Sequence, residues 1–99
     1  MPTVAEKRAT FADLHKSGTF VLPNPWDAGS AKILESLGFK ALASTSAGMA
    51  WSHGRPDMKV EIGTVLDHLT LLVGATTLPV NADFENAFAH DPDGVAANV

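Results

Sequence analysis

The 99-residue sequence contains no cysteine and no excess of basic residues. The absence of thiols excludes disulfide frameworks, cysteine-ligated zinc and thiol nucleophiles, so any chemistry must use oxygen or imidazole groups. Seven basic and 11 acidic side chains give a formal net charge of −4. Because such a chain lacks the lysine and arginine excess that binds phosphate backbones, no nucleic-acid partner is expected.

Long hydrophobic runs and an N-terminal signal are also missing. The longest apolar stretches, such as residues 69–75, are far shorter than the roughly 18 to 20 residues that span a bilayer, so no membrane partner is expected. The first seven residues lack the apolar segment of a secretory signal, which favours a cytoplasmic protein. The hydrophobic share of 45% and the charged share of 18% are typical of a folded chain. One domain with a small core is predicted.

Helix signals and strand signals alternate along the chain. Thr3 and Glu6 form a capping-box pattern that opens a predicted helix at about 4–16. Asp27 can cap a second helix of about ten residues, and apolar positions on one side predict a third at about 58–75. Short runs rich in β-branched and aromatic residues predict strands at about 19–22, 39–43 and 78–82.

This alternation, with connections long enough for parallel pairing, is typical of the α/β class. In parallel α/β folds the ligand site lies beyond the carboxyl ends of the strands. The candidate site is therefore expected in three segments, residues 23–27, 44–57 and 81–86.

Carboxylates follow two of the predicted strands. Asp57, Asp83 and Glu85 lie in segments expected to meet at one edge of the sheet, with Asn81 as a neutral oxygen ligand nearby. Oxygen ligands with retained waters suit a hard cation such as magnesium, which could stabilise developing negative charge on a substrate. The alternative is that each carboxylate caps the helix after its loop.

Small polar residues follow the second predicted strand. Residues 44–48 read STSAG, without the lysine and spacing of a nucleotide-binding P-loop. One interpretation is that their backbone N–H and hydroxyl groups serve as hydrogen-bond donors to a carboxylate or phosphonate. The alternative is a turn of small residues, in which the backbone can come close to a neighbouring part of the chain or to a ligand.

The histidines and tryptophans are less specific. His53 and His90 are candidates for acid–base or ligand roles, whereas His15 and His68 are expected in helices as surface or core residues. Trp26 and Trp51 either wall a pocket or cover the core, and covering the core is the expectation for Trp26.

Four segments occur in a characteristic order: FVLPNPWDAGSA at 20–31, STSAG at 44–48, GRPD at 54–57 and LPVNADFEN at 78–86. Together they resemble the isocitrate lyase/phosphoenolpyruvate mutase superfamily, and most of all its phosphonomutase-like or 2-methylisocitrate-lyase-like members. The resemblance covers about residues 11–99.

The resemblance implies a magnesium-dependent (β/α)8 barrel that cleaves or forms carbon–carbon or carbon–phosphorus bonds in small 2-oxo and dicarboxylic acids, through an enolate-like intermediate. Asp57 and Asp83 would hold the metal, largely through waters. Asn81 stands where the best-known members carry a carboxylate, and Glu85 is a candidate to compensate. Backbone donors for the substrate's carboxylate or phosphoryl oxygens would come from Ser44, Thr45, Ser46 and Ala47.

A complete barrel of this kind takes about 250 residues. The resemblance therefore implies that residues 1–99 are a single partial domain, the N-terminal portion of a (β/α)8 barrel with about three strand–helix units, inactive by itself. Open strand edges invite pairing between chains, so a homo-oligomer is expected. Inward-facing side chains are expected to lack opposing partners, with Val21, Leu42 and Val80 as examples.

Two other functions stay open. The chain could be a non-catalytic α/β binding or assembly module with a degenerate metal site at Asn81. An open nucleotide-binding fold fits the alternation less well, because residues 23–25 read PNP where a glycine-rich phosphate loop would be needed.

Overall fold

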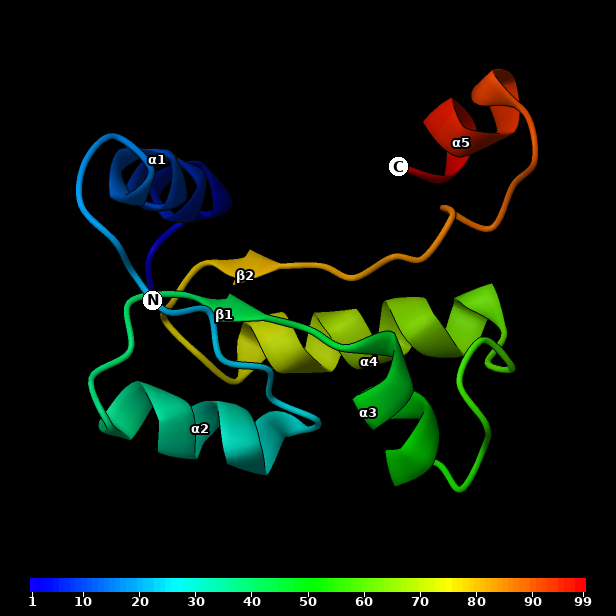
Figure 1. The fold of residues 1–99 in the computed structure, drawn as a ribbon, viewed down its shortest axis with the longest axis horizontal. Coiled ribbons are helices and arrows are strands. Elements are labelled where there is room, and N and C mark those ends of the chain that lie inside the picture. The colour runs from blue at the N-terminus through cyan, green and yellow to red at the C-terminus, as the bar shows by residue number, and fades with distance from the viewer.

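The computed structural model describes all residues 1–99, as five helices and two short strands (Figure 1). The mixed α/β character that the sequence predicts is confirmed. None of the helices combines the length and hydrophobicity that a membrane crossing requires. The elements are α1 (Val4–Leu14), α2 (Ala28–Ser36), β1 (Leu42–Ala43), α3 (Ser46–Ser52), α4 (Ile62–Gly74), β2 (Val80–Asn81) and α5 (Pro92–Asn98).

The two strands pair in parallel, with Leu42 opposite Val80. They are shorter than the predicted 39–43 and 78–82. Residues 19–22 form no strand, which corrects the prediction made for them. The segment that follows them contributes one bond to β1, from the Ala43 N–H to the Pro23 carbonyl at 3.0 Å. Prolines at 23 and 25 cannot donate to a ladder, and this limits pairing along the segment.

The helix starts follow the capping signals in the sequence. Thr3 and Glu6 form the expected capping box of α1, and the Asp27 carboxylate accepts the Ser30 N–H at 2.7 Å to cap α2. The predicted helix at 58–75 begins later, at Ile62. Met58 has a left-handed backbone conformation, with φ of +66°, that a right-handed helix cannot include.

Two helices lie in segments that were predicted as loops. Thr45 caps α3 by accepting the Gly48 N–H at 3.1 Å. Asp91 caps α5 in the same way through the Gly94 N–H at 2.6 Å, with Pro92 in the first helical turn. Both helices are short, so neither shows the long apolar periodicity by which helices are predicted.

The helices α2, α3 and α4 lie on one side of the strands, and α1 and α5 lie on the other (Figure 1). Ala31 of α2, Leu42 of β1 and Leu72 of α4 form one buried cluster. Leu42 therefore has partners after all, because it faces α2 and α4. Val21 is 63% exposed, as expected for a side chain without an opposing layer. A second cluster joins α3 to α4, and its buried members are Met49, Ala50, Val60 and Val65.

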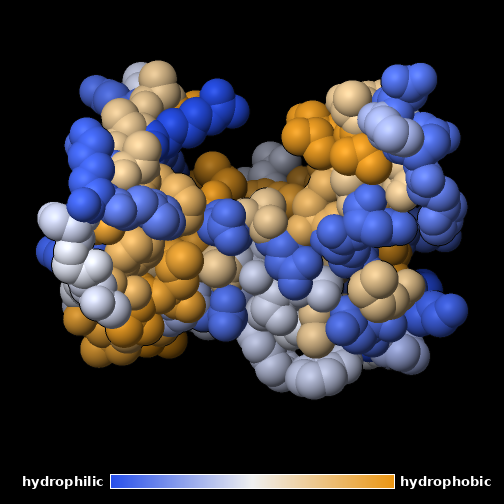
Figure 2. All heavy atoms as spheres, turned by 45° about the horizontal axis from the view of Figure 1, so that its top comes forward, coloured by the Kyte–Doolittle hydropathy of each residue, from blue (hydrophilic) through white to orange (hydrophobic).

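A buried lysine fixes α1 to the rest of the chain. The Lys7 ammonium donates to the carbonyl oxygen of Val73 at 3.3 Å and to that of Thr76 at 2.8 Å. Both acceptors lie where α4 ends and the chain turns toward β2. On the α1 and α5 side, hydrophobic residues border a hollow between the two helices (Figure 2). The strands thus have one face covered by helices and one face opening toward this hollow.

Candidate functional site

The carboxyl ends of β1 and β2 are joined by three hydrogen bonds. The Ser44 N–H donates to the Asn81 carbonyl at 2.9 Å, and the Asp83 N–H donates to the Ser44 hydroxyl at 2.8 Å. The Ser46 N–H then donates to Oδ2 of Asp83 at 3.2 Å. The segments 44–47 and 81–86, which the sequence places at neighbouring strand ends, are therefore in direct contact.

The Asp83 carboxylate is oriented by two backbone donors. Besides the Ser46 N–H on Oδ2, the Glu85 N–H donates to Oδ1 at 3.2 Å. Asp83 itself is exposed to solvent. A carboxylate that is held by main-chain groups and still accessible is suited to bind an ion or a water.

The pKa of Glu85 is affected by its burial and by the charges of two other carboxylates. Partial burial raises the pKa of its carboxyl above the ordinary 4.5, and the negative charges of Asp57 and Asp83 raise that pKa further. Asp57, which reaches this region from the loop after α3, accepts its neighbour Met58's N–H at 2.9 Å. Glu85 therefore lies close enough to Asp57 and Asp83 for their charges to act on its carboxyl.

The alternative that these acids cap helices is wrong. The N-cap of α4 is Glu61, which makes no side-chain cap bond, and the N-cap of α5 is Asp91. Asp57, Asp83 and Glu85 take no such position. Asp83 does accept the N–H of Ser46, the first residue of α3, but that helix precedes Asp83 in the chain and does not follow its loop.

Oxygen donors are the ligands that magnesium prefers, and a cation would relieve the repulsion that raises the pKa of Glu85. No three acidic or histidine side chains are close enough to one another to surround an ion directly. Asn81, at the end of β2, is exposed and adds a neutral oxygen donor. A magnesium ion at these oxygens would therefore have to keep several of its waters, as magnesium usually does in proteins.

Three of the four predicted substrate-binding residues already use donors or acceptors within the chain. Ser44 is buried and its hydroxyl accepts the Asp83 N–H. Thr45 caps α3, and the Ser46 N–H is bonded to Asp83. Ala47 is the second residue of α3. The segment thus serves both as the start of a helix and as the partner of Asp83.

Sequence reasoning missed the role of Asn24 and misplaced Trp26. The Asn24 side-chain amide donates to the Ala43 carbonyl at 2.9 Å, which ties the 23–27 loop to the end of β1. Trp26 is 43% exposed and does not cover the core. Its ring stacks edge-to-face on Trp51, with centroids 5.5 Å apart. The backbone of Gly48 lies close to the Trp26 ring, so that a Cβ at this position would overlap the ring. This is the close approach that the small residues at 44–48 predict.

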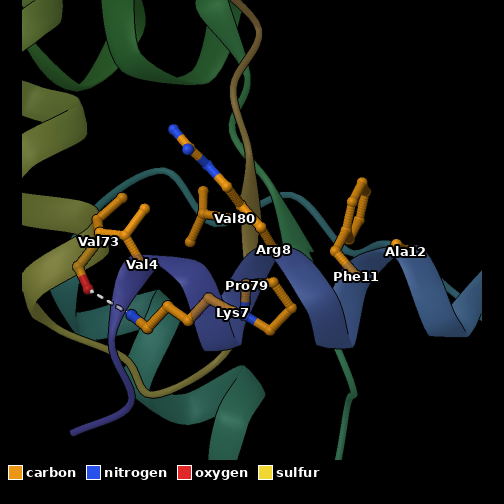
Figure 3. Close-up of a pocket in the computed structure, with 8 residues that line it drawn as sticks. All are labelled: Val4, Lys7, Arg8, Phe11, Ala12, Val73, Pro79 and Val80. Atoms are coloured by element: carbon orange, nitrogen blue, oxygen red, sulfur yellow. Dashed lines mark hydrogen bonds between the residues drawn. The ribbon is translucent and has the colours of Figure 1, made fainter.

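A cavity of about 330 Å³ lies elsewhere, between α1, α4 and β2 (Figure 3). Lys7, Phe11 and Val80 are among its lining residues, and none of the predicted site residues is. The cavity lies beside α1, and its walls are mostly apolar. It therefore differs from the carboxylate region in both place and chemistry. Because it contains none of the carboxylates, the candidate site is placed at the strand ends and not in this cavity.

The chain is similar to known proteins along most of its length. Residues 11–99 match the sequence profile of the family described as phosphoenolpyruvate phosphomutase. A Mycobacterium tuberculosis protein of uncharacterized function is 35% identical over 88 residues, which are 88% of this chain and 34% of that protein.

Solved structures show the same relationship. A Burkholderia cenocepacia protein assigned as a lyase/mutase has 48% identity and a TM-score of 0.92, over 95% of this chain and 34% of that one. A second protein of that organism, assigned as a phosphonomutase, has 37% identity and a TM-score of 0.88, over 94% and 39%. A 2,3-dimethylmalate lyase has 27% identity and a TM-score of 0.75, over 95% and 34%.

The chain spans about a third of the length of these relatives. The match nevertheless includes every segment that forms the candidate site, from the 23–27 loop to the residues after β2. The chain therefore belongs to the phosphoenolpyruvate mutase/isocitrate lyase superfamily.

Proposed function

We propose that the chain is part of a magnesium-dependent lyase or phosphonomutase-type enzyme that acts on a small 2-oxo or dicarboxylic acid through an enolate-like intermediate. One observation carries the proposal: Asp83 is hydrogen-bonded to Ser46, beside the coupled carboxylates of Asp57 and Glu85. The segment proposed to bind the anion and the acids proposed to bind the cation both lie at the carboxyl ends of parallel strands, where α/β enzymes place their ligands.

The roles of the residues follow from their chemistry. Asp57, Asp83 and Glu85, with Asn81 as a neutral donor, would hold magnesium largely through waters. Magnesium, when bound, stabilises the negative charge that develops on an enolate oxygen. The segment Ser44, Thr45, Ser46 and Ala47 would orient the carboxylate or phosphonate of the substrate. An anionic substrate beside three carboxylates requires this cation, because like charges at short range repel.

Calorimetric titration with magnesium tests the proposal, together with turnover of 2-oxo, dimethylmalate-type and phosphonate substrates by a protein that includes the remainder of the barrel. Asp83→Ala is expected to weaken magnesium binding about tenfold or more, about 1.4 kcal/mol, because a charged ligand is lost. Asp67→Ala is the matched control, since Asp67 is an exposed acid on α4. Equal magnesium affinity in wild type and Asp83→Ala would contradict the assignment.

A non-catalytic binding or assembly module is the second candidate. It is favoured by Asn81, which stands in place of a carboxylate, and by the lack of three acids or histidines close enough for direct coordination. Such a module would bind a small carboxylate equally well with and without magnesium, and would convert none of the candidate substrates.

Because the chain spans about a third of its relatives, we propose that catalysis needs the remainder of a barrel and that residues 1–99 alone are inactive. Unpaired strand edges support association of copies, so a homo-oligomer in the cytoplasm is proposed, with a small carboxylate or phosphonate as ligand. Sedimentation and a lyase assay on the 99-residue chain test both statements. A monomer with full activity would refute them.

A further inference from the structure

His68 is a buried titratable group for which the proposed chemistry has no use. It lies within α4 and is only 8% exposed. Its Nε2 is completely buried and has no hydrogen-bond partner. A buried polar atom without a partner costs about 1 to 3 kcal/mol, so such an atom calls for an explanation.

The ring of His68 faces the ring of His53. The two centroids are 6.2 Å apart and the planes cross at 72°. His53 is the C-cap of α3, and its Nδ1 lies 2.9 Å from the Met49 carbonyl oxygen. Because a carbonyl can only accept, this Nδ1 carries a hydrogen, and the His53 ring is fixed at the end of α3. The two histidines therefore connect α3 with α4.

Two charged groups act on His68 from neighbouring elements, His53 from α3 and Asp27 from the start of α2. Burial is the largest effect and lowers the pKa of His68 below the ordinary 6.5; the His53 charge lowers it further, and the Asp27 carboxylate opposes both. Protonation would therefore place a cation in a buried position against a second histidine. Asp27 is exposed and compensates only in part.

We propose that the His53–His68 pair is a pH-sensitive contact that holds α3 on α4 at neutral pH and loosens α3 in acid. The hydrophobic contact beside it is small, since α3 contributes only Met49 and Ala50 to the buried cluster that it shares with α4. The contact does not depend on the proposed function. Its consequence does, because α3 begins with Ser46 and Ala47 of the substrate segment.

The sign follows from linkage. Since the folded state binds a proton on His68 less readily than the unfolded state, the contact is at full strength above the ordinary pKa of 6.5. It weakens as the pH falls through 6.5 toward the lower pKa of the folded state. Histidine is the side chain that titrates in this range without other perturbation.

An NMR titration from about pH 8 to about pH 5 tests the proposal. The His68 ring is expected to titrate below its ordinary pKa of 6.5. The amides of Met49 and Ala50 are expected to shift with the same midpoint. A His68 midpoint at or above 6.5, or α3 amides that do not follow it, would overturn the proposal.

Variants separate this contact from general acid unfolding. His68→Leu removes the charge and the unpartnered nitrogen, so α3 should lose its acid transition, while the exposed control His90→Gln should keep it. If His68→Leu does not fold, the variant His53→Gln tests whether the two rings are coupled. It removes the opposing charge and should raise the His68 midpoint by a fraction of the about one unit by which protein environments commonly shift a pKa. An unchanged midpoint would mean that the rings are not coupled and would overturn the proposal.

Discussion

The two ends of the β1–β2 pair differ in how their charges are satisfied. At the N-terminal end, the buried Lys7 ammonium is bonded to the carbonyls of Val73 and Thr76. At the carboxyl end, the negative charges of Asp57 and Asp83 act on the Glu85 carboxyl, and none of the three acids is in an ion pair. The one ion pair of the chain, between Lys16 and Asp13 at 2.7 Å, lies far along α1 on the surface.

The backbone shows the same difference. Glu85, Ala87 and Phe88 have left-handed conformations, with φ of +54°, +60° and +56°. Each costs about 1 to 2 kcal/mol for a residue other than glycine. Around Lys7 the chain has ordinary helical geometry. The comparison shows that one end serves stability, while the other holds charge and strain of the kind found at functional sites.

Removing the Lys7 ammonium at the N-terminal end of the strand pair should have the largest effect on stability. Lys7→Met keeps most of the apolar side chain but removes both hydrogen bonds, so the free energy of unfolding should fall by about 1.5 to 3 kcal/mol. Urea denaturation measures it, with the exposed Lys32→Met as control. A loss below about 0.5 kcal/mol, as for an ordinary surface change, would show that Lys7 does not hold α1 in place.

Adding a negative charge at the carboxyl end of the strand pair should have an intermediate effect, on magnesium binding. Asn81→Asp adds a carboxylate at the end of β2, and should tighten magnesium binding up to about tenfold, about 1.4 kcal/mol. Calorimetry measures the change. Asn86→Asp adds the same charge elsewhere in the loop and should do less. Equal affinities in both variants would mean that net charge, and not a site at Asn81, attracts the ion.

Removing the Glu85 charge at the carboxyl end of the strand pair should have the smallest effect, and only on stability. Because the folded state raises the pKa of Glu85, its stabilising contribution is full below the ordinary 4.5 and is lost as the pH rises through the folded value. Glu85→Gln should therefore raise stability at neutral pH by about 0.5 kcal/mol or less, the range of surface changes. The gain should vanish at acid pH. A gain that persists in acid would contradict the explanation.

Local signals predicted much of the secondary structure. The Thr3–Glu6 box and Asp27 marked the starts of α1 and α2, and Asp91 followed by Pro92 was an equally readable signal for α5 that was overlooked. Helix α3 was harder to predict, because serine and glycine favour loops. It is stabilised by burial of Met49 and Ala50 against α4, a long-range effect.

The strands and the aromatic residues were harder to predict for the same reason. Whether a short β-branched run becomes a strand depends on a partner, and residues 19–22 have none in the ladder. Leu42 is buried because α2 and α4 cover it, and Trp26 is exposed because it stacks on Trp51 instead of the core. Sequence spacing does not reveal such neighbours.

The sequence by itself determined the family and the caps of α1 and α2, because these depend on residue types at fixed spacing. Only the tertiary structure decided that Asp83 is bonded to Ser46, that Lys7 is buried among carbonyls, and that His68 faces His53. These contacts join residues that are 37, 69 and 15 positions apart. They form only when helices pack on the parallel strands, since hydrogen bonds and burial depend on distance in space and not on separation along the chain.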